Sequence, residues 1–233
     1  PTLSARATFV LAEAARATKR CAEATPLYQI RLAVRRELSD LAAGDTVIVA
    51  TSGGADSSAL AAALIQESQT RSINPIAAII DHGLQPNSAD VAQAAKNELS
   101  KIGYSAIEIR KVAVDVKDGM EASARRARYA ALDEIARSHN AAAIFLGHTK
   151  DDQAETVLLG LARGSGARSL AGMSEVNGIY VRPFLEITRQ QTVQACEELN
   201  LKPWNDPHNE DETFLRVKVR KHVLPTMERE LGP

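Results

Sequence analysis

The sequence predicts an α/β fold, a Rossmann-like parallel sheet of about five strands with helices on both faces. Short apolar, β-branched runs alternate with longer amphipathic segments along the 233-residue chain, which is the pattern of right-handed βαβ units. The runs are apolar throughout, as expected of strands buried on both faces. Chemically distinctive residues follow several runs, and such sheets bind ligands outside the carboxyl ends of their strands.

The expected elements follow in order along the chain. Residues 1–40 predict one or two helices broken near Pro26, which pack on the sheet through Leu32, Val34, Leu38 and Leu41. We expect strands at 46–50, 76–80, 106–109, 142–146 and 180–184. We expect helices at 58–65, 88–102 with Ser88 as N-cap, 119–137, 150–163 and 189–199. The predicted organisation is an N-terminal helical segment (1–45), a catalytic domain (46–200) and a basic helical C-terminal extension (201–233).

Composition excludes several classes of protein. No apolar run reaches the roughly 18 residues that a membrane span needs, and no leader with a cleavage site is visible, so we expect a cytoplasmic protein without a membrane contact. Cys21 and Cys196 lie far apart, which argues against a zinc site or a disulfide framework. A net charge of −1 gives no global attraction to nucleic acid, so an RNA contact requires local basic patches.

A glycine-containing turn lies between the first expected strand and its helix. A turn at a helix N-terminus offers unpaired backbone amides and the positive end of the helix dipole, which together bind anions. The turn lacks the lysine of the GxxxxGK[ST] loop. Its Asp56 would repel a polyphosphate unless a cation lay between them, so we infer Mg²⁺ held by Asp56 and phosphate oxygens. The alternative is an ordinary capped βα turn. The predicted phosphate-binding residues are Ser52, Gly53, Gly54, Ala55, Asp56 and Ser57.

A second group of functional candidates follows the fourth expected strand. His148 comes just after the strand, and Asp151, Asp152 and Glu155 occupy the first turns of the next helix. Spacings of three and four residues place the three carboxylates on roughly one face. Capping of the helix explains one acidic residue. Three carboxylates beside a histidine indicate a cation site.

The motifs resemble those of a known family. SGGADS resembles the PP-loop of ATP pyrophosphatases, and GHTKDDQAETVLLGLARGSG resembles the GHxxDDxxET and RGSG signature of bacterial tRNA(Ile)-lysidine synthases. DHGL, EASARRARY, RPFLE, DPHN and FLR match the same family in the same order, over about 47–225. The resemblance implies a PP-loop (adenine nucleotide alpha hydrolase-like) fold. Members of this family commonly continue into further C-terminal domains.

The resemblance also implies a reaction. ATP adenylylates the wobble cytidine in the CAU anticodon of tRNA(Ile), and the ε-amine of L-lysine then displaces AMP. Asp151, Asp152 and Glu155 would bind the lysine ammonium, and one of these residues or His148 would accept its proton. We therefore take Asp56, His148, Asp151 and Asp152 as candidate catalytic residues. Ile80, His82, Gly147 and Arg128 complete the predicted ATP site.

Basic residues supply the predicted tRNA contacts. Arg125 and Arg128 fit the family pattern EAxARxxRY, and we assign Arg128 to ATP and Arg125 to tRNA. The alternative for Arg125 is an exposed ion pair with Glu121. Arg216 and Arg220 lie in a run without acidic residues, which favours RNA contact over the alternative of a solvated helix face.

Other functions remain open at this point. A tRNA 2-thiolation enzyme would need cysteines near the loop, and this chain has none there. Guanylate and argininosuccinate synthases share the PP-loop but lack the acidic signature. A nucleotide sensor that never turns ATP over would need no cation site for lysine.

Overall fold

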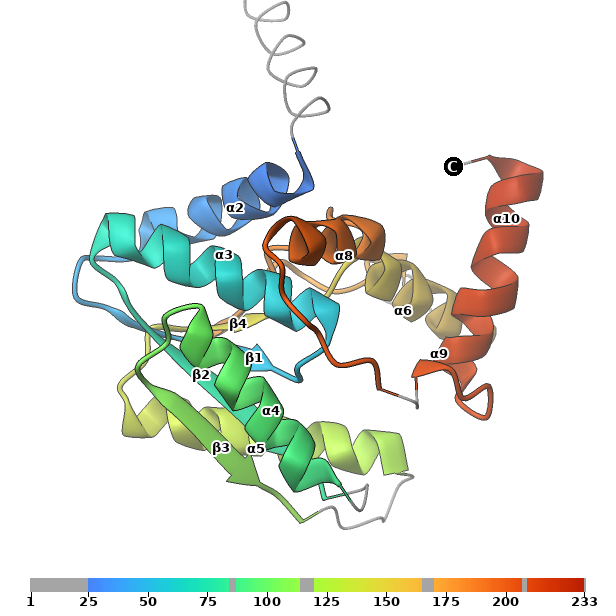
Figure 1. Cartoon of the computed structure of the whole chain (residues 1–233). Helices are drawn as coiled ribbons and strands as arrows, with labels where there is room; N and C mark the ends of the chain where they lie inside the picture. Colours follow the sequence, from blue (N-terminus) through green and yellow to red (C-terminus); the bar gives the residue numbers. More distant parts are fainter. Residues whose placement is uncertain (1–24, 84–86, 114–119, 165–169, 207–208, 233) are drawn as a thin grey trace, which may run out of the picture.

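A six-stranded sheet forms the centre of the protein (Figure 1). The computed structural model describes residues 25–83, 87–113, 120–164, 170–206 and 209–232. The strand order is β3-β2-β1-β4-β6-β5, and every pairing is parallel except that of β5 with β6. The strands are β1 (Thr46–Thr51), β2 (Asn74–Asp81), β3 (Ile107–Lys111), β4 (Ala143–Leu146), β5 (Val176–Asn177) and β6 (Tyr180–Val181).

The predicted α/β class and parallel sheet are confirmed. Each of the five expected strands is present, although the fifth is only the two-residue β6. The antiparallel β5 was not predicted, because two exposed residues carry no period that a sequence could reveal. β5 and β6 form a hairpin at the edge of the sheet.

Helices cover both faces of this sheet, and two of them begin at residues other than those expected. Ser88 is the first residue of α4 and Asn87 is its N-cap, so the predicted cap was wrong by one position. α3 also begins three residues before its expected start and runs on to Arg71. The long helices are α2 (Pro26–Glu37), α3 (Ala55–Arg71), α4 (Ser88–Lys101), α5 (Met120–Ser138), α6 (Lys150–Ala162) and α8 (Arg189–Glu198).

Alternate residues of the central strand face opposite layers. Val47 and Val49 of β1 pack among residues of α2, α3 and α8, whereas Ile48 and Ala50 pack against α5. Figure 1 shows α2, α3 and α8 on one side of the sheet and α5 on the other. Burial on both faces explains why β1 lacks the alternation of apolar and polar residues typical of a half-exposed strand.

Helix α2 belongs to the same core as the sheet. Ile30, Val34 and Leu38 are fully buried, whereas the predicted contacts Leu32 and Leu41 are only half-buried. Thr25 caps the helix by accepting a hydrogen bond from the Tyr28 amide at 3.3 Å. Residues 1–24 of the predicted N-terminal segment lie outside the described residues.

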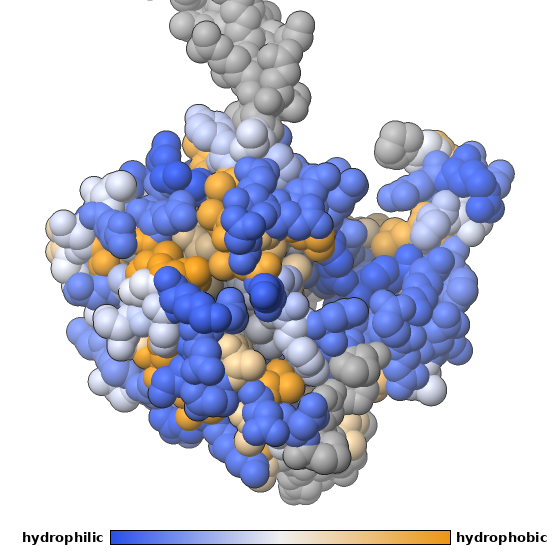
Figure 2. Space-filling view, viewed as in Figure 1, coloured by the Kyte–Doolittle hydropathy of each residue, from blue (hydrophilic) through white to orange (hydrophobic). Residues whose placement is uncertain are grey.

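The last described segment forms a C-terminal arm, residues 215–231, beside α6 (Figure 1). It consists of α9 (Leu215–Lys218), a π-helical turn (Val219–Val223) and α10 (Leu224–Leu231). Its visible surface is mainly hydrophilic (Figure 2). Within the described ranges, no helix combines the length and apolar character that crossing a bilayer would require.

The topology places the site. β1 lies between β2 and β4, so the chain leaves it in one direction first and later adds strands on its other side. The carboxyl ends of parallel strands meet at one edge, and Ala50 is in register with both Ala78 and Leu146. The segments after β1, β2 and β4 therefore converge at the switch point, where ligands bind in such sheets.

A buried ion pair joins α2 to α3 and generates a stability prediction. Glu67 of α3 is 1% exposed, and its two carboxylate oxygens accept hydrogen bonds from Arg31 Nε at 2.7 Å and Arg35 Nε at 2.8 Å. The bond from Arg35 holds the pKa of Glu67 below its ordinary 4.5 despite burial, and Arg31 adds to the effect. We expect Glu67→Gln to lower the free energy of unfolding by about 1–3 kcal/mol in urea at pH 7.

The matched control is Glu98→Gln, which breaks the pair of Lys101 and Glu98 on α4, in which the lysine is exposed, and should cost under about 1 kcal/mol. A carboxylate with a lowered folded pKa contributes stability that is fully present above the unfolded pKa and is lost as pH falls. The difference between wild type and Glu67→Gln should therefore shrink below about pH 4.5. An equal cost for both variants would contradict this assignment.

Candidate active site

The segments at the carboxyl edge of the sheet enclose a cleft of about 780 Å³. Its walls come from the glycine turn, α5, the start of α6, α8, residues 203–205 and 209–210, and the C-terminal arm. The predicted site residues that line it are Ser52, Gly54, Ala55, Asp56, Ser57, His82, Arg125, Arg128, Gly147, His148, Asp152, Arg216 and Arg220. Segments more than a hundred residues apart in sequence thus meet at one place.

The turn after β1 is held in one conformation by its own hydroxyls. Gly53 has a φ of +83°, a left-handed conformation that glycine adopts without strain. Ser57 Oγ donates to the Gly54 carbonyl at 3.0 Å and accepts from the Ser52 amide at 3.2 Å. Gly54 is the N-cap of α3 and has no side chain to cap it, so the first-turn amides are available to an anion.

Gly147 lies against the backbone of this turn. A Cβ at Gly147 would lie 3.1 Å from the Asp56 carbonyl oxygen and 3.2 Å from the Ser57 amide nitrogen. These atoms cannot move without displacing the start of α3. The glycine after β4 therefore permits the close approach of the two βα units that form the cleft.

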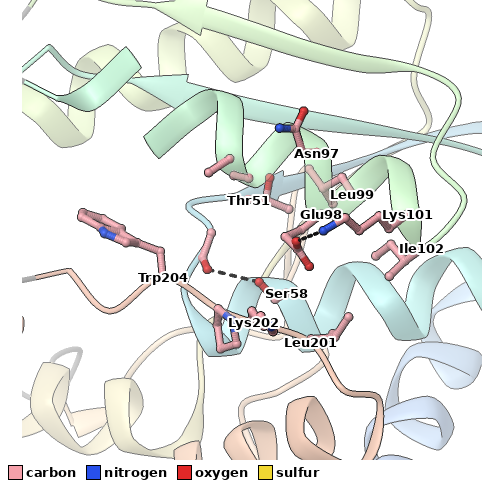
Figure 3. Close-up of a pocket in the computed structure, with 14 residues that line it drawn as sticks. Thr51, Ser58, Asn97, Glu98, Leu99, Lys101, Ile102, Leu201, Lys202 and Trp204 are labelled. Atoms are coloured by element: carbon pink, nitrogen blue, oxygen red, sulfur yellow. Dashed lines mark hydrogen bonds and ion pairs between the residues drawn. The ribbon is translucent and has the colours of Figure 1, made fainter. Parts of the chain in front are cut away.

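The outer side of the glycine turn faces a smaller cavity of 230 Å³ (Figure 3). Gly53 lines this cavity and not the larger cleft. Its carbonyl accepts hydrogen bonds from the Trp204 amide at 2.8 Å and from Ser58 Oγ at 3.3 Å. The figure shows Glu98 and Lys101 of α4, paired with each other, at this cavity. The predicted Ile80 lines a third cavity of 160 Å³, together with His82 and Arg128.

Helix α8 holds Asp56. The hydroxyl of Thr192 donates to one carboxylate oxygen of Asp56, and Arg189 Nη2 lies 3.2 Å from the other. Burial raises the pKa of Asp56, and the Arg189 charge and the Thr192 hydrogen bond oppose this rise. Among the described residues, no cluster of three or more His, Cys, Asp or Glu side chains could hold a metal. One carboxylate that lines the cleft still fits Mg²⁺, which binds through one or two carboxylates and substrate phosphates.

Asp152 has two partners. Its Oδ2 accepts from the Thr149 amide at 2.8 Å and completes a capping box at the start of α6. Its Oδ1 lies 3.4 Å from Arg189 Nη2. Burial alone would raise the pKa of Asp152, but the Thr149 amide and the Arg189 charge hold it below its ordinary value. Capping and cation contact, the two interpretations of this residue, are therefore both present.

The other two carboxylates of the predicted trio have protein partners. Asp151 Oδ2 accepts from the Arg189 backbone amide at 2.8 Å. Glu155 is fully buried, and its Oε1 accepts from Arg220 Nε at 2.7 Å. Its Oε2 lies 3.5 Å from Arg216 Nη1. Asp152 alone of the trio lines the cleft, and Glu155 attaches the C-terminal arm to α6.

Burial keeps both cleft histidines neutral. Burial and then the charge of Arg128 lower the pKa of His148 to about 3. The same two causes lower the pKa of His82. Nδ1 of each ring is buried and, in the described part of the chain, has no hydrogen-bond partner. Burial also lowers the pKa of Arg128, although the nearby charge of Asp152 acts to raise it.

Aromatic residues position Arg125 at the rim of the cleft. Its guanidinium carbon lies 5.0 Å from the centre of the Tyr129 ring, a cation–π geometry. Its Nη2 donates to Tyr129 Oη at 3.3 Å, and Tyr129 packs on Tyr180 with ring centres 4.8 Å apart. The Glu121 side chain, the alternative partner of Arg125, lies outside the described residues.

Sequence reasoning missed several residues of this site, among them Arg189, Thr192 and Trp204. Thr188 and Gln191 form a capping box at the start of α8, and that signal could have located the helix start. It could not show that Arg189 and Thr192, one turn apart, both reach Asp56. Trp204 contacts the turn through its backbone amide, which every residue except proline carries.

Comparison with known proteins identifies the family to which the chain belongs. The family model described as a PP-loop domain matches residues 26–227. A tRNA(Ile)-lysidine synthase of Thermobifida fusca is 49% identical over 89% of this chain and 64% of its own length. The enzymes of that name from Leifsonia xyli and Streptomyces coelicolor are 49% and 50% identical over 83% and 80% of this chain. The chain spans 58% and 54% of those two relatives.

A solved structure supports the fold. The U34-tRNA thiolase NcsA from Methanococcus maripaludis, solved with its [4Fe-4S] cluster, superimposes with a TM-score of 0.74. The match covers 89% of this chain and 75% of the other at 18% identity. A likeness at this identity shows a shared fold, and function must be argued from the site.

The approach of Gly147 to the turn generates a prediction. Gly147→Ala should weaken ATP binding about tenfold, or about 1.4 kcal/mol, because the added methyl group displaces the amides of the turn. Isothermal titration calorimetry with ATP and Mg²⁺ measures the change. Gly178→Ala is the control, since Gly178 has a φ of +60° and a Cβ added there would enter open space. The control should lose about 1–2 kcal/mol of stability and keep its ATP affinity. Unchanged ATP affinity in Gly147→Ala would show that the turn does not bind phosphate.

Proposed function

Because this chain belongs to the PP-loop domain family, we propose that it is the ATP-dependent catalytic part of a tRNA(Ile)-lysidine synthase. It ligates L-lysine to the wobble cytidine of the CAU anticodon of tRNA(Ile), in the cytoplasm. The observation that carries the proposal is the shared contact of Arg189, which lies within 3.4 Å of both Asp56 beside the glycine turn and Asp152 of the acidic motif. A triphosphate at the turn and an ammonium at Asp152 would then lie in one cleft.

Two bond exchanges make up the proposed reaction. First, the oxygen at position 2 of the cytosine attacks the α-phosphorus of ATP, and the bond to the β-phosphate breaks to release diphosphate. Next, the lysine ε-amine attacks carbon 2 of the activated base. The bond between carbon 2 and the adenylyl oxygen then breaks to release AMP. The amine loses a proton in this second step, so the site needs a proton acceptor.

The residues of the glycine turn bind and orient the nucleotide. The first-turn amides of α3 and the hydroxyls of Ser52 and Ser57 face the phosphates. Arg128 supplies positive charge from α5, and Ile80 and His82 line the adjoining cavity for the nucleoside. Asp56 would hold Mg²⁺, which would add positive charge at the phosphates.

The proton of the lysine ammonium passes to His148 or to Asp152, which also attracts the ammonium. Its carboxylate lines the cleft, and its lowered pKa keeps it charged at neutral pH. His148 is neutral but its pKa of about 3 makes it a weak base. Asp151 and Glu155 do not line the cleft. They contribute negative charge near it while bonded to Arg189 and to the C-terminal arm, respectively. Arg125, Arg216 and Arg220 at the cleft provide the positive charge that an RNA backbone requires.

The direct test is incubation of the protein with ATP, Mg²⁺, labelled lysine and CAU-anticodon tRNA(Ile). We expect AMP release that depends on the tRNA, with label transferred into the RNA. Transfer of sulfur instead of lysine would support a thiolation enzyme, and ATP binding without AMP release would support a sensor. Either result would reject the proposal. Because the chain spans 54–64% of the three relatives named above, a chain extended to the length of the relatives is tested in parallel.

Substitution of the acidic residues separates their roles. Asp152→Asn keeps an oxygen that can accept from Thr149 but removes the charge, so we expect the lysine KM to rise about tenfold or more. Glu155→Gln leaves Arg216 and Arg220 without a buried counter-charge and should lower thermal stability as well. Asp90→Asn, at an exposed first turn of α4, is the control for the cap position. An unchanged lysine KM in both Asp152→Asn and Glu155→Gln would remove the lysine site from this cleft.

A further inference from the structure

Arg189 is the cation on which the two halves of the cleft converge. Its Nη2 lies 3.2 Å from Asp56 Oδ2 and 3.4 Å from Asp152 Oδ1. The charges of Asp56, Asp152, Glu155 and Asp151 raise the pKa of Arg189 against the effect of burial. It is therefore a permanent positive charge where the substrate ammonium is proposed to bind.

Backbone hydrogen bonds fix the start of α8, from which this side chain extends. Arg189 is the first residue of α8, directly after the N-cap Thr188. Its amide donates to Asp151 Oδ2 at 2.8 Å, and the Lys150 amide donates to the Ile187 carbonyl at 2.8 Å. These two bonds tie the start of α8 to the start of α6. The side chain is 28% exposed, so it faces the cleft and is not enclosed by its partners.

The guanidinium is only partly satisfied by the protein. Arg189 Nε is buried and has no hydrogen-bond partner within the described ranges. Its contact to Asp152 is a single long one, whereas a bidentate arginine–carboxylate pair makes two parallel bonds. A side chain held this loosely can share its carboxylates with another cation.

The geometry points to Arg189 as a positioning residue that shares Asp152 with the lysine ε-ammonium and so favours the free amine that attacks the activated cytidine. This inference rests on the proposed function. The ammonium must approach Asp152 to bind, and there it lies beside a second cation. Repulsion between the two cations weakens lysine binding but lowers the pKa of the bound ammonium, the effect by which a neighbouring cation activates a lysine nucleophile.

The other charged groups around Asp152 do not replace this effect. Asp56 faces it from α3, His148 from the β4–α6 connection, and Asp151 and Glu155 from α6. Arg128 and Arg125 face the cleft from α5, Arg182 lies at the end of β6, and Arg216 and Arg220 lie on the C-terminal arm. Of these cations, Arg216 and Arg220 pair with Glu155. Within the described part of the chain, Arg189 is the cation that forms an ion pair with Asp152.

A phosphate clamp is the competing role for Arg189. Arginine binds phosphate well, but Arg189 forms its ion pairs with carboxylates. Arg125, Arg128 and Lys221 also line the cleft. The two roles differ in which substrate's KM changes when Arg189 is replaced. Loss of a clamp raises the KM for ATP, whereas loss of a shared counter-cation lowers the KM for lysine and slows turnover.

The experiment uses Arg189→Gln, with Arg189→Lys as the conservative variant and the exposed Arg137→Gln as control. Lysine and ATP kinetics of tRNA lysylation are measured from pH 6.5 to 9.5. In Arg189→Gln we expect the KM for lysine to fall and kcat at pH 7 to fall about tenfold, with the profile of kcat moving about one pH unit upward. Raising the pH should then restore turnover. Arg189→Lys should keep most of kcat, and Arg137→Gln should match wild type.

A less basic lysine analogue, S-(2-aminoethyl)-cysteine, supplies a second readout. Its less basic amine loses a proton more readily, so Arg189→Gln should lower kcat less with this analogue than with lysine. Parallel losses of kcat for the two amines with an unchanged pH profile, or a raised KM for ATP, would overturn the inference. Circular dichroism melting checks that each variant is folded. Absence of lysine transfer by wild type would reject the proposed function itself, which separates the two failures.

Discussion

The contact of α8 with two carboxylates from different βα units is the interaction on which the site depends. Asp56 follows β1 and Asp152 follows β4, and the strands are adjacent in the sheet. Bringing two partly buried carboxylates together is unfavourable unless a cation compensates their charges. Arg189 supplies that cation, and Thr192 supplies a hydroxyl to Asp56 one turn later. These contacts orient the two acidic groups within the cleft.

The charge balance of the cleft differs from what its acidic motif suggests. The lining carboxylates are Asp56, Asp152 and Glu210, whereas the lining cations are Arg125, Arg128, Arg189, Arg216, Arg220 and Lys221. Such an excess of positive charge suits a triphosphate and an RNA backbone. A lysine ammonium must therefore find a local negative group within a positive cleft. In the proposed reaction Asp152 would provide it, and the same surroundings would favour loss of the ammonium proton.

The fold was predictable because its signals are local. The apolar runs of β1, β2 and β4 predict buried parallel strands, and the glycine turn predicts a phosphate site. The order of the family motifs predicts that these segments converge. The partners of the charged residues were not predictable in the same way. Glu155 and Arg220 are 65 residues apart and Asp56 and Thr192 are 136 apart. Only the packing of α8 and the C-terminal arm decides these pairs. The hairpin of β5 and β6 was hidden for another reason, since strands of two residues carry no hydrophobic period.

The most direct test of the central claim is a crystal structure with lysine and an ATP analogue that has a methylene group between the α- and β-phosphates. The account predicts the phosphates at the amides of the glycine turn, and the lysine side-chain nitrogen within hydrogen-bond distance of Asp152 in the same cleft. Phosphates in the cavity on the outer side of Gly53, or lysine at a site remote from Asp152, would contradict it.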